Sequence, residues 1–239
     1  MSKIYITMPD TKPYYLTIFF HQSDFSVLVF DKDKQLISSK KTSIDLLHTT
    51  EDELVRIMAQ EPEIQQDYQK VRIVCESANY AFVPKEIFRP DDMEIFLNFQ
   101  GKKSESTPLF NLIEEKSVVN VFSLPENLSR SLSRFYEQPK VEHHLTYLLN
   151  DFAHNGKTQA VFLWLHPDYF DLVVCSDKRL EFANSFNIST KEDLLYFTLL
   201  VFEQLSLDIH NTEITVLNAE NQQDTINLLR QYIKKIVVK

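Results

Sequence analysis

The chain has 239 residues, of which 44% are hydrophobic and 25% are charged, proportions that are typical of a soluble globular protein with one large or two small domains. Its formal net charge of −9 argues against general nucleic-acid binding, because phosphates require a basic protein surface. The richest apolar run, Leu194–Phe202, has about half the roughly 18 residues that a membrane-spanning helix needs, so no membrane segment is expected.

A three-stranded antiparallel meander is predicted first. Residues 14–20 (YYLTIFF) are rich in aromatic and β-branched side chains, and strands at 25–31 and 35–41 follow after the short turns HQSD and KDK. The tetrapeptide TEDE at 50–53 has the spacing of a capping box, which opens a helix. The almost continuous apolar run at 71–77 (VRIVCES) predicts a strand that is buried on both faces.

Further units of helix and strand are expected before the second half. DDMEIFLNF is interpreted as a short helix, QGKKSESTP as a loop, VVNVFSLP as a strand and ENLSRSLSRFYE as an amphipathic helix. KVEHH is expected to be a short strand, which would point His143 and His144 to opposite faces. Only Glu142 and His144 would then share a face, and two ligands are too few for a metal site.

The opening order of elements then returns. Strands are predicted at 161–165, 170–176 and 179–186, with the turns HPDY and DK between them. Ser189 and Glu192 form another capping box, and the helix that they open carries apolar residues on several sides.

A fourth strand at 213–220 completes the second copy, before a helix at 225–233 and a last strand, KIVVK, whose basic residues are interpreted as solvated. Because five elements match in the same order, we infer a duplicated domain. The predicted domains are residues 1–154 and the shorter residues 155–239.

The compartment follows from the thiols and the N-terminus. Cys75 and Cys175 each lie within an apolar run, as core cysteines of a reducing compartment do, rather than as a disulfide or a metal pair. Residues 1–10 lack the long apolar stretch of a secretory signal. A cytoplasmic protein is therefore expected.

The duplicated meander resembles the actin-like ATPase fold, an α/β fold of two tandem ribonuclease-H-like domains. The whole chain is also similar to a bacterial family of unknown function for which that fold has been reported; the two meanders, FVPKEIF and NVFSLPENL carry this resemblance. In members that bind ATP, a glycine-bearing turn in each first hairpin wraps the phosphates with backbone N–H groups, and the first strand supplies an Asp.

This chain departs from that pattern. HQSD and HPDY contain no glycine, and neither first strand carries the Asp. Pro167 also removes a backbone donor. The only glycines, Gly101 and Gly156, lie elsewhere, although average usage of about 7% would give roughly 17. The resemblance therefore implies a degenerate nucleotide site, and ATP hydrolysis by the familiar mechanism is not expected.

Four turn residues remain as weak candidates for a site in a cleft between the domains: His21, Asp24, His166 and Asp168. The histidines could bind a metal or an anion there, and the alternative is that each ends a strand and makes a local hydrogen bond. Glu76 and Glu220 follow the fourth strands and could approach the same cleft. Ribonuclease-H-like nucleases need carboxylates on the first strands, which are absent here.

No catalytic residue, cofactor or metal is assigned. We expect a non-catalytic binding or scaffolding protein with an unidentified protein partner and no contact with a membrane. The alternative is an enzyme or nucleotide-binding protein that uses a non-standard site between the domains. The sequence gives no indication of the oligomeric state.

Overall fold

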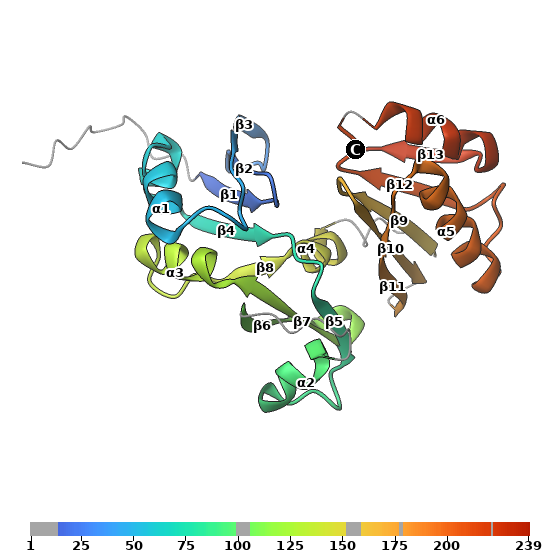
Figure 1. Cartoon of the computed structure of the whole chain (residues 1–239), viewed down its shortest axis with the longest axis horizontal. Coiled ribbons are helices and arrows are strands. Elements are labelled where there is room, and N and C mark those ends of the chain that lie inside the picture. Colours follow the sequence, from blue (N-terminus) through green and yellow to red (C-terminus); the bar gives the residue numbers. More distant parts are fainter. Residues whose placement is uncertain (1–13, 99–105, 152–158, 177–178, 221) are drawn as a thin grey trace, which may run out of the picture. The chain divides into compact units, whose positions relative to one another are not determined.

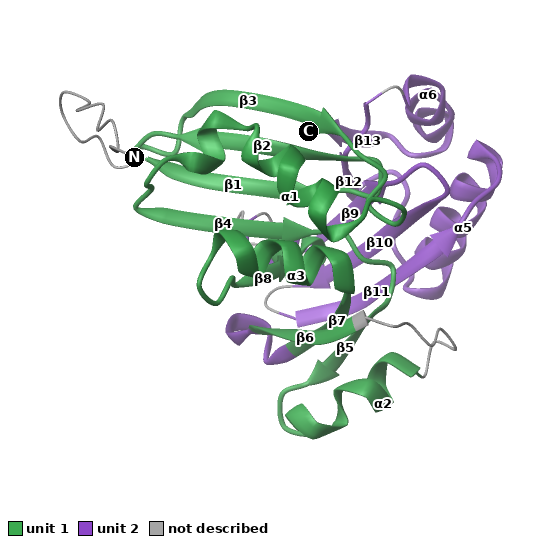
Figure 2. Ribbon diagram, turned by 60° about the vertical axis from the view of Figure 1, so that its left-hand side comes forward, with its two compact units in different colours: residues 1–112, 119–147 green, residues 113–118, 148–239 purple. Residues whose placement is uncertain are grey.

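The computed structural model describes residues 14–98, 106–151, 159–176, 179–220 and 222–239. The chain divides into two compact units, of which unit 1 comprises residues 1–112 and 119–147 and unit 2 comprises residues 113–118 and 148–239 (Figure 2). Both glycines and the predicted domain boundary between residues 154 and 155 lie outside the described residues.

Unit 1 contains the first predicted meander within a five-stranded sheet of order β3-β2-β1-β4-β8 (Figure 1). The first three strands are antiparallel neighbours, whereas β4 pairs in parallel with both β1 and β8. The strands are β1 (Tyr15–Phe20), β2 (Asp24–Phe30), β3 (Leu36–Ser43), β4 (Lys70–Cys75) and β8 (Val141–His143). The residues of β1 from Leu16 to Phe20 are buried, as their apolar sequence predicts.

Two helices of unit 1 pack against each other, α1 (Glu51–Ala59) and α3 (Glu126–Phe135) (Figure 1). The predicted capping box is present, since Thr50 and Glu53 each accept the other's backbone N–H. On α3, Asn127 donates its side-chain amide to the carbonyls of Leu46 and Thr49, which fixes the loop that leads into α1.

A buried carboxylate ties the end of α1 to the edge of the sheet. Glu61 follows the C-cap residue of α1, is 4% exposed and is the N-cap of the short 3-10 turn η1 (Pro62–Gln65). Thr42 of β3 donates a 2.7 Å hydrogen bond to it, and Lys40 of β3 forms an ion pair with it. Burial acts to raise the pKa of Glu61, but these two partners outweigh burial and lower it.

A second, three-stranded sheet of order β5-β7-β6 also belongs to unit 1. Its strands are β5 (Tyr80–Pro84), β7 (Val118–Pro125) and β6 (Ser106–Ile113), and its short helical elements are η2 (Pro90–Asp92) and α2 (Met93–Asn98). The connection from β6 to β7 contains η3 (Glu114–Lys116) and belongs to unit 2. Val83, Leu97, Val119 and Val121 form its core. The sequence predicted β7 and α2 but placed a loop through Pro108, because a polar stretch precedes the apolar half of β6.

Asn111 of β6 connects the two sheets of unit 1. Its side-chain amide donates to the carbonyl of Val141 at 2.9 Å and accepts the backbone N–H of His143 at 2.8 Å. One side chain therefore provides hydrogen-bond partners for backbone groups at the edge of β8, as a neighbouring strand would.

Strand β8 ends one residue earlier than predicted, because His144 opens α4 (His144–Asp151). The expected alternation of His143 and His144 across a strand is therefore wrong. Glu142 does face away from the core, where Arg72 holds both of its oxygens, with 2.9 Å between Nη2 and Oε1. Such a two-point contact makes Arg72 and Glu142 a structural ion pair between β4 and β8.

Unit 2 repeats the topology with the order β11-β10-β9-β12-β13 (Figure 1). Here too the meander is antiparallel, and β12 runs parallel to both β9 and β13. Its strands and helices are β9 (Gln159–Leu165), β10 (Tyr169–Ser176), β11 (Arg179–Asn187), α5 (Lys191–Gln204), β12 (Glu213–Leu217), α6 (Gln223–Tyr232) and β13 (Lys235–Val238). The predicted repeat is confirmed at the level of strand order and direction.

Helix α5 begins one residue later than predicted. Thr190 is the N-cap, and Asp193, not Glu192, completes the capping box. The sequence contains two overlapping boxes, and the observed one leaves Leu194, Thr198, Val201 and other residues of one face buried. Tyr196 is 61% exposed, so the helix is not buried on all sides. None of the described helices is long and apolar enough to span a bilayer.

Candidate functional site

The first candidate turn, residues 21–24, closes on itself. The backbone N–H of His21 donates to the carbonyl of Asp24 at 2.8 Å, and the carbonyls of Gln22 and Ser23 accept N–H groups from residues 46 and 44. None of the four residues has a positive φ. The turn therefore needs no glycine, and its polar backbone groups bond within unit 1.

His21 is held from two sides. Its ring stacks on Phe19 at 4.7 Å between centroids, and its Nδ1 lies 2.8 Å from Oε1 of Glu76, at the end of β4. Its Nε2 is 4.0 Å from Oδ1 of Asp24, too far for a hydrogen bond. Asp24 instead accepts from Ser23 at 3.2 Å and pairs with Lys41 at 3.4 Å. The structure thus brings His21, Asp24 and Glu76 together.

The second candidate turn, residues 166–169, has the same backbone bond, from the N–H of His166 to the carbonyl of Tyr169 at 3.0 Å. The carbonyl of Asp168 accepts from Ile188, as that of Ser23 accepts from Ile44. Asp168 therefore occupies the position of Ser23 in the repeat. The side chain of Asp168 is exposed, and among the described residues no contact between it and His166 is seen.

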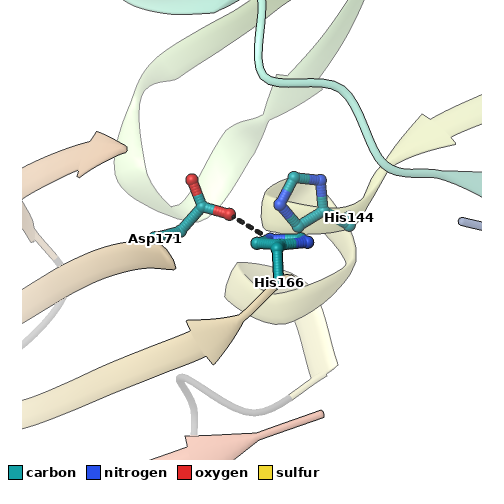
Figure 3. A group of neighbouring side chains, drawn as sticks. All are labelled: His144, His166 and Asp171. Atoms are coloured by element: carbon teal, nitrogen blue, oxygen red, sulfur yellow. Dashed lines mark hydrogen bonds and ion pairs between the residues drawn. The ribbon is translucent and has the colours of Figure 1, made fainter. Parts of the chain in front are cut away.

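His166 is bound by a carboxylate that the sequence analysis did not single out. Nε2 of His166 lies 2.8 Å from Oδ2 of Asp171 on β10, as the dashed line in Figure 3 marks. Ser185 of β11 donates to the other oxygen of Asp171, and the His166 ring stacks on Tyr169 at 3.9 Å. Both members of the pair are buried, at 4% and 0% exposed.

The two histidines are thus fixed by carboxylates from different elements. Pairing of β1 with β4 places Cys75 opposite Phe20, so Glu76 lies beside His21. Pairing of β9 with β12 places Leu217 opposite Trp164, which gives Ala219 the position of Glu76 and moves Glu220 one residue further along. Glu220 therefore does not replace Glu76. The pattern that could have revealed Asp171 is a lone charge inside the apolar strand FDLVVCS.

A cavity of about 140 Å³ lies beside the second turn, within unit 2. Its lining includes His166, Pro167, Thr190, Lys191 and Thr225. It adjoins the start of α5, where N–H groups would otherwise be available to an anion.

A side chain of α5 itself takes the N–H groups of the two residues that precede the helix. Asp193 accepts from the backbone of Ser189 at 2.9 Å and of Thr190 at 2.8 Å. These hydrogen bonds lower the pKa of Asp193, which keeps a negative charge at the helix start. An incoming phosphate would meet the carboxylate of Asp193 at the helix start.

A buried polar network around His143 was also not predicted. Nδ1 of His143 is 3.0 Å from the amide nitrogen of Asn120, and Nε2 is 2.9 Å from the carbonyl of Ser77. The same amide of Asn120 donates to Thr146 at 3.0 Å. His143 is fully buried and bonded through both ring nitrogens, so it joins β8, β7 and the end of β4 and serves the fold of unit 1.

Comparisons with known proteins agree with this architecture. A family model described as "Protein of unknown function (DUF3822)" matches residues 6–236. No curated protein matches the sequence. A solved Bacteroides thetaiotaomicron protein with an actin-like ATPase fold and unknown function is 20% identical, with a TM-score of 0.83 over 98% of this chain and 94% of that one.

Two further solved structures are similar at lower identity. The ethanolamine utilization protein EutJ from Carboxydothermus hydrogenoformans is 7% identical, with a TM-score of 0.53 over 98% of this chain and 87% of that one. The PilM–PilN type IV pilus biogenesis complex gives 12% identity and a TM-score of 0.51 over 97% of this chain and 89% of that one. At such identities the likeness establishes the actin-like fold and no activity.

Proposed function

We propose that this chain, which belongs to the family of proteins of unknown function DUF3822, is a non-catalytic binding protein that holds a protein partner in the cytoplasm. The observation that carries the proposal is that neither hairpin turn has the backbone of a phosphate-binding turn. Each is closed by its own backbone hydrogen bond, contains no glycine and has no residue with a positive φ. Each histidine is locked by a carboxylate at 2.8 Å.

These features disfavour nucleotide binding for a physical reason. A phosphate-binding turn presents backbone N–H groups, which must lie open and close to the ligand. Here the N–H groups of His21 and His166 bond within their turns, and carboxylates of Glu76, Asp171 and Asp193 stand nearby in their respective units. A polyphosphate would be repelled by these charges and would gain few hydrogen bonds in return.

The retained scaffold supports a role in binding a protein. Both five-stranded sheets have a buried core: most residues of β1, β9, β10 and β12 are buried, as is the second half of β4. A structure of the same fold is that of the PilM–PilN type IV pilus biogenesis complex, so the fold occurs in an assembly of proteins. The burial of both cysteines suits a reducing compartment.

Nucleotide binding is tested by thermal melts with millimolar ATP and magnesium. A ligand at 100 times its Kd would stabilise the native state by about 2.7 kcal/mol. At roughly 2–4 °C per kcal/mol for a chain of this size, that is a rise of several degrees. We expect a shift within measurement error. A magnesium-dependent rise that is lost in His21→Ala or His166→Ala would overturn the proposal and favour a nucleotide-dependent function.

The positive test is affinity purification of the tagged full-length chain from its native cell. We expect a protein to co-purify in a fixed ratio and to be retained when ATP and magnesium are added to the wash. Release of that protein by ATP would contradict the proposal, since it would couple the interaction to a nucleotide site.

A further inference from the structure

Strand β13 is a four-residue edge of the unit 2 sheet, protected against unselective strand addition by Lys235 and by the lysine that follows the strand, Lys239. The other described edges of the two five-stranded sheets are modified. Strand β3 pairs with β2 through an irregular register near Phe30, β11 pairs with β10 through one near Cys175, and β8 is capped by Asn111. The register between β12 and β13 is continuous.

The two faces of β13 differ in chemistry. Ile236 packs against the core of unit 2, and Val238 lies on the same face because side chains alternate along a strand. Lys235, Val237 and Lys239 point to the opposite face and are all exposed. That face presents a charge, an apolar residue and a charge at alternate positions.

The basic character of this edge is local. Residues 228–239 contain four basic residues and no acidic one, in a chain whose net charge is −9. An acidic protein therefore has a local basic region at this end of unit 2, and two of its lysines, Lys235 and Lys239, lie on one face along β13, which favours the approach of an acidic segment.

The register with the inner strand places an acidic residue beside a lysine, and Nζ of Lys235 also donates to the carbonyl of Asn211 at 3.2 Å. Glu213 of β12 stands opposite Lys235, and Thr215 stands opposite Val237. Directly opposite charges stabilise neighbouring strands, whereas like charges destabilise them. A strand on the outer side should follow the same rule.

The backbone of β13 offers donors toward the outer side. The N–H of Lys239 donates inward to the carbonyl of Val216 at 2.9 Å. Because successive residues of a strand direct their N–H groups to opposite sides, those of Ile236 and Val238 point outward.

We propose that an acidic, extended segment of the partner protein adds a strand to the outer edge of β13, with acidic residues beside Lys235 and Lys239 and an apolar residue beside Val237. The segment has the pattern acidic–x–apolar–x–acidic, which reads the same in either strand direction. The main-chain hydrogen bonds supply affinity, and the alternate side chains supply selectivity. Antiparallel pairing of two copies about Val237 would set Lys235 against Lys239, so a second copy of this chain is disfavoured.

This inference rests on the proposed function and identifies the surface and the partner chemistry for it. The test uses the full chain and fluorescent peptides of sequence TETVTET and TKTVTKT, whose binding is followed by anisotropy at low salt. We expect the acidic peptide to bind at least about tenfold more tightly, since two opposite-charge pairs replace two like-charge pairs. Hydrogen exchange of the Ile236 and Val238 amides should slow when it binds.

The variant Lys235→Glu/Lys239→Glu should reverse the preference and bind the basic peptide. The matched control, Lys32→Glu/Lys191→Glu, changes the net charge equally at exposed positions outside β13 and outside residues 228–239, and it should keep the preference for the acidic peptide. Val238→Pro, which removes one outward N–H, should weaken both complexes. Melting curves check that each variant is folded.

Three results would overturn the inference. They are equal binding of the two peptides, equal loss in the control variant, and self-association of the wild type that competes with the peptide. If the charge-reversed variant still captures the same cellular protein as the wild type, the β13 surface is refuted while the proposed binding function stands. If ATP raises the melting temperature, the proposed function itself falls.

Discussion

Replacing Asp171 by Ala should destabilise the protein strongly. Its carboxylate is fully buried and accepts from the ring of His166 at 2.8 Å and from the hydroxyl of Ser185. Each buried donor that loses its acceptor costs about 1–3 kcal/mol, so we expect a loss of about 3 kcal/mol in the free energy of unfolding. At roughly 2–4 °C per kcal/mol, the melting temperature should fall by about 6–12 °C.

Urea denaturation followed by circular dichroism measures this loss, with Asp168→Ala as the matched control. Asp168 is an exposed carboxylate three residues away, and its removal should change stability by less than about 0.5 kcal/mol. Asp171→Asn keeps an acceptor oxygen and should lie between the two. If Asp171→Ala and Asp168→Ala unfold at the same urea concentration, the pair that locks the second turn does not stabilise the fold, and our account of that turn is wrong.

Three further outcomes are expected. On α5, Leu194→Asp should unfold unit 2 because Leu194 is 1% exposed, whereas Tyr196→Asp should be tolerated because Tyr196 is 61% exposed; equal melting curves would show that the helix face is misassigned. Glu61→Gln should destabilise the chain at neutral pH and much less in acid. The pKa of Glu61 is lowered in the folded state, so the carboxylate stabilises the fold above its ordinary pKa of 4.5, and this contribution is lost as the pH falls through the folded-state pKa. A difference in urea midpoint between variant and wild type that does not change with pH would refute this. Burial raises the pKa of Cys75 and Cys175, so both thiols should react with Ellman's reagent far more slowly in the native protein than in guanidinium chloride, and rapid native reaction would contradict their burial.

Local pattern was sufficient to predict the repeated meander. Period-two and continuous apolar runs report how a strand is buried, and a capping box reports where a helix begins, so these features can be read within a few residues. The predicted strands at 14–20 and 161–165 are β1 and β9, and TEDE opens α1 as expected. The absence of glycine from HQSD and HPDY likewise follows from sequence alone, and the closed turns agree with it.

Local pattern was not sufficient where alternatives overlap. Two capping boxes lie one residue apart before α5, and only packing of the helix selects Thr190 as the N-cap. The local sequence allows His144 to end a strand or to begin a helix. In the structure it is the first residue of α4, which follows β8 without a loop.

The partners of the two histidines were decided by tertiary structure. Glu76 reaches His21 because β4 pairs with β1 in a register that joins residues about 55 positions apart in the chain. In unit 2 the corresponding register puts Ala219 in that position, so His166 turns instead to Asp171 on the neighbouring strand. A strand's own sequence specifies which faces are apolar, but which residues meet across a sheet depends on pairing between distant segments, and a shift of one residue exchanges the partners.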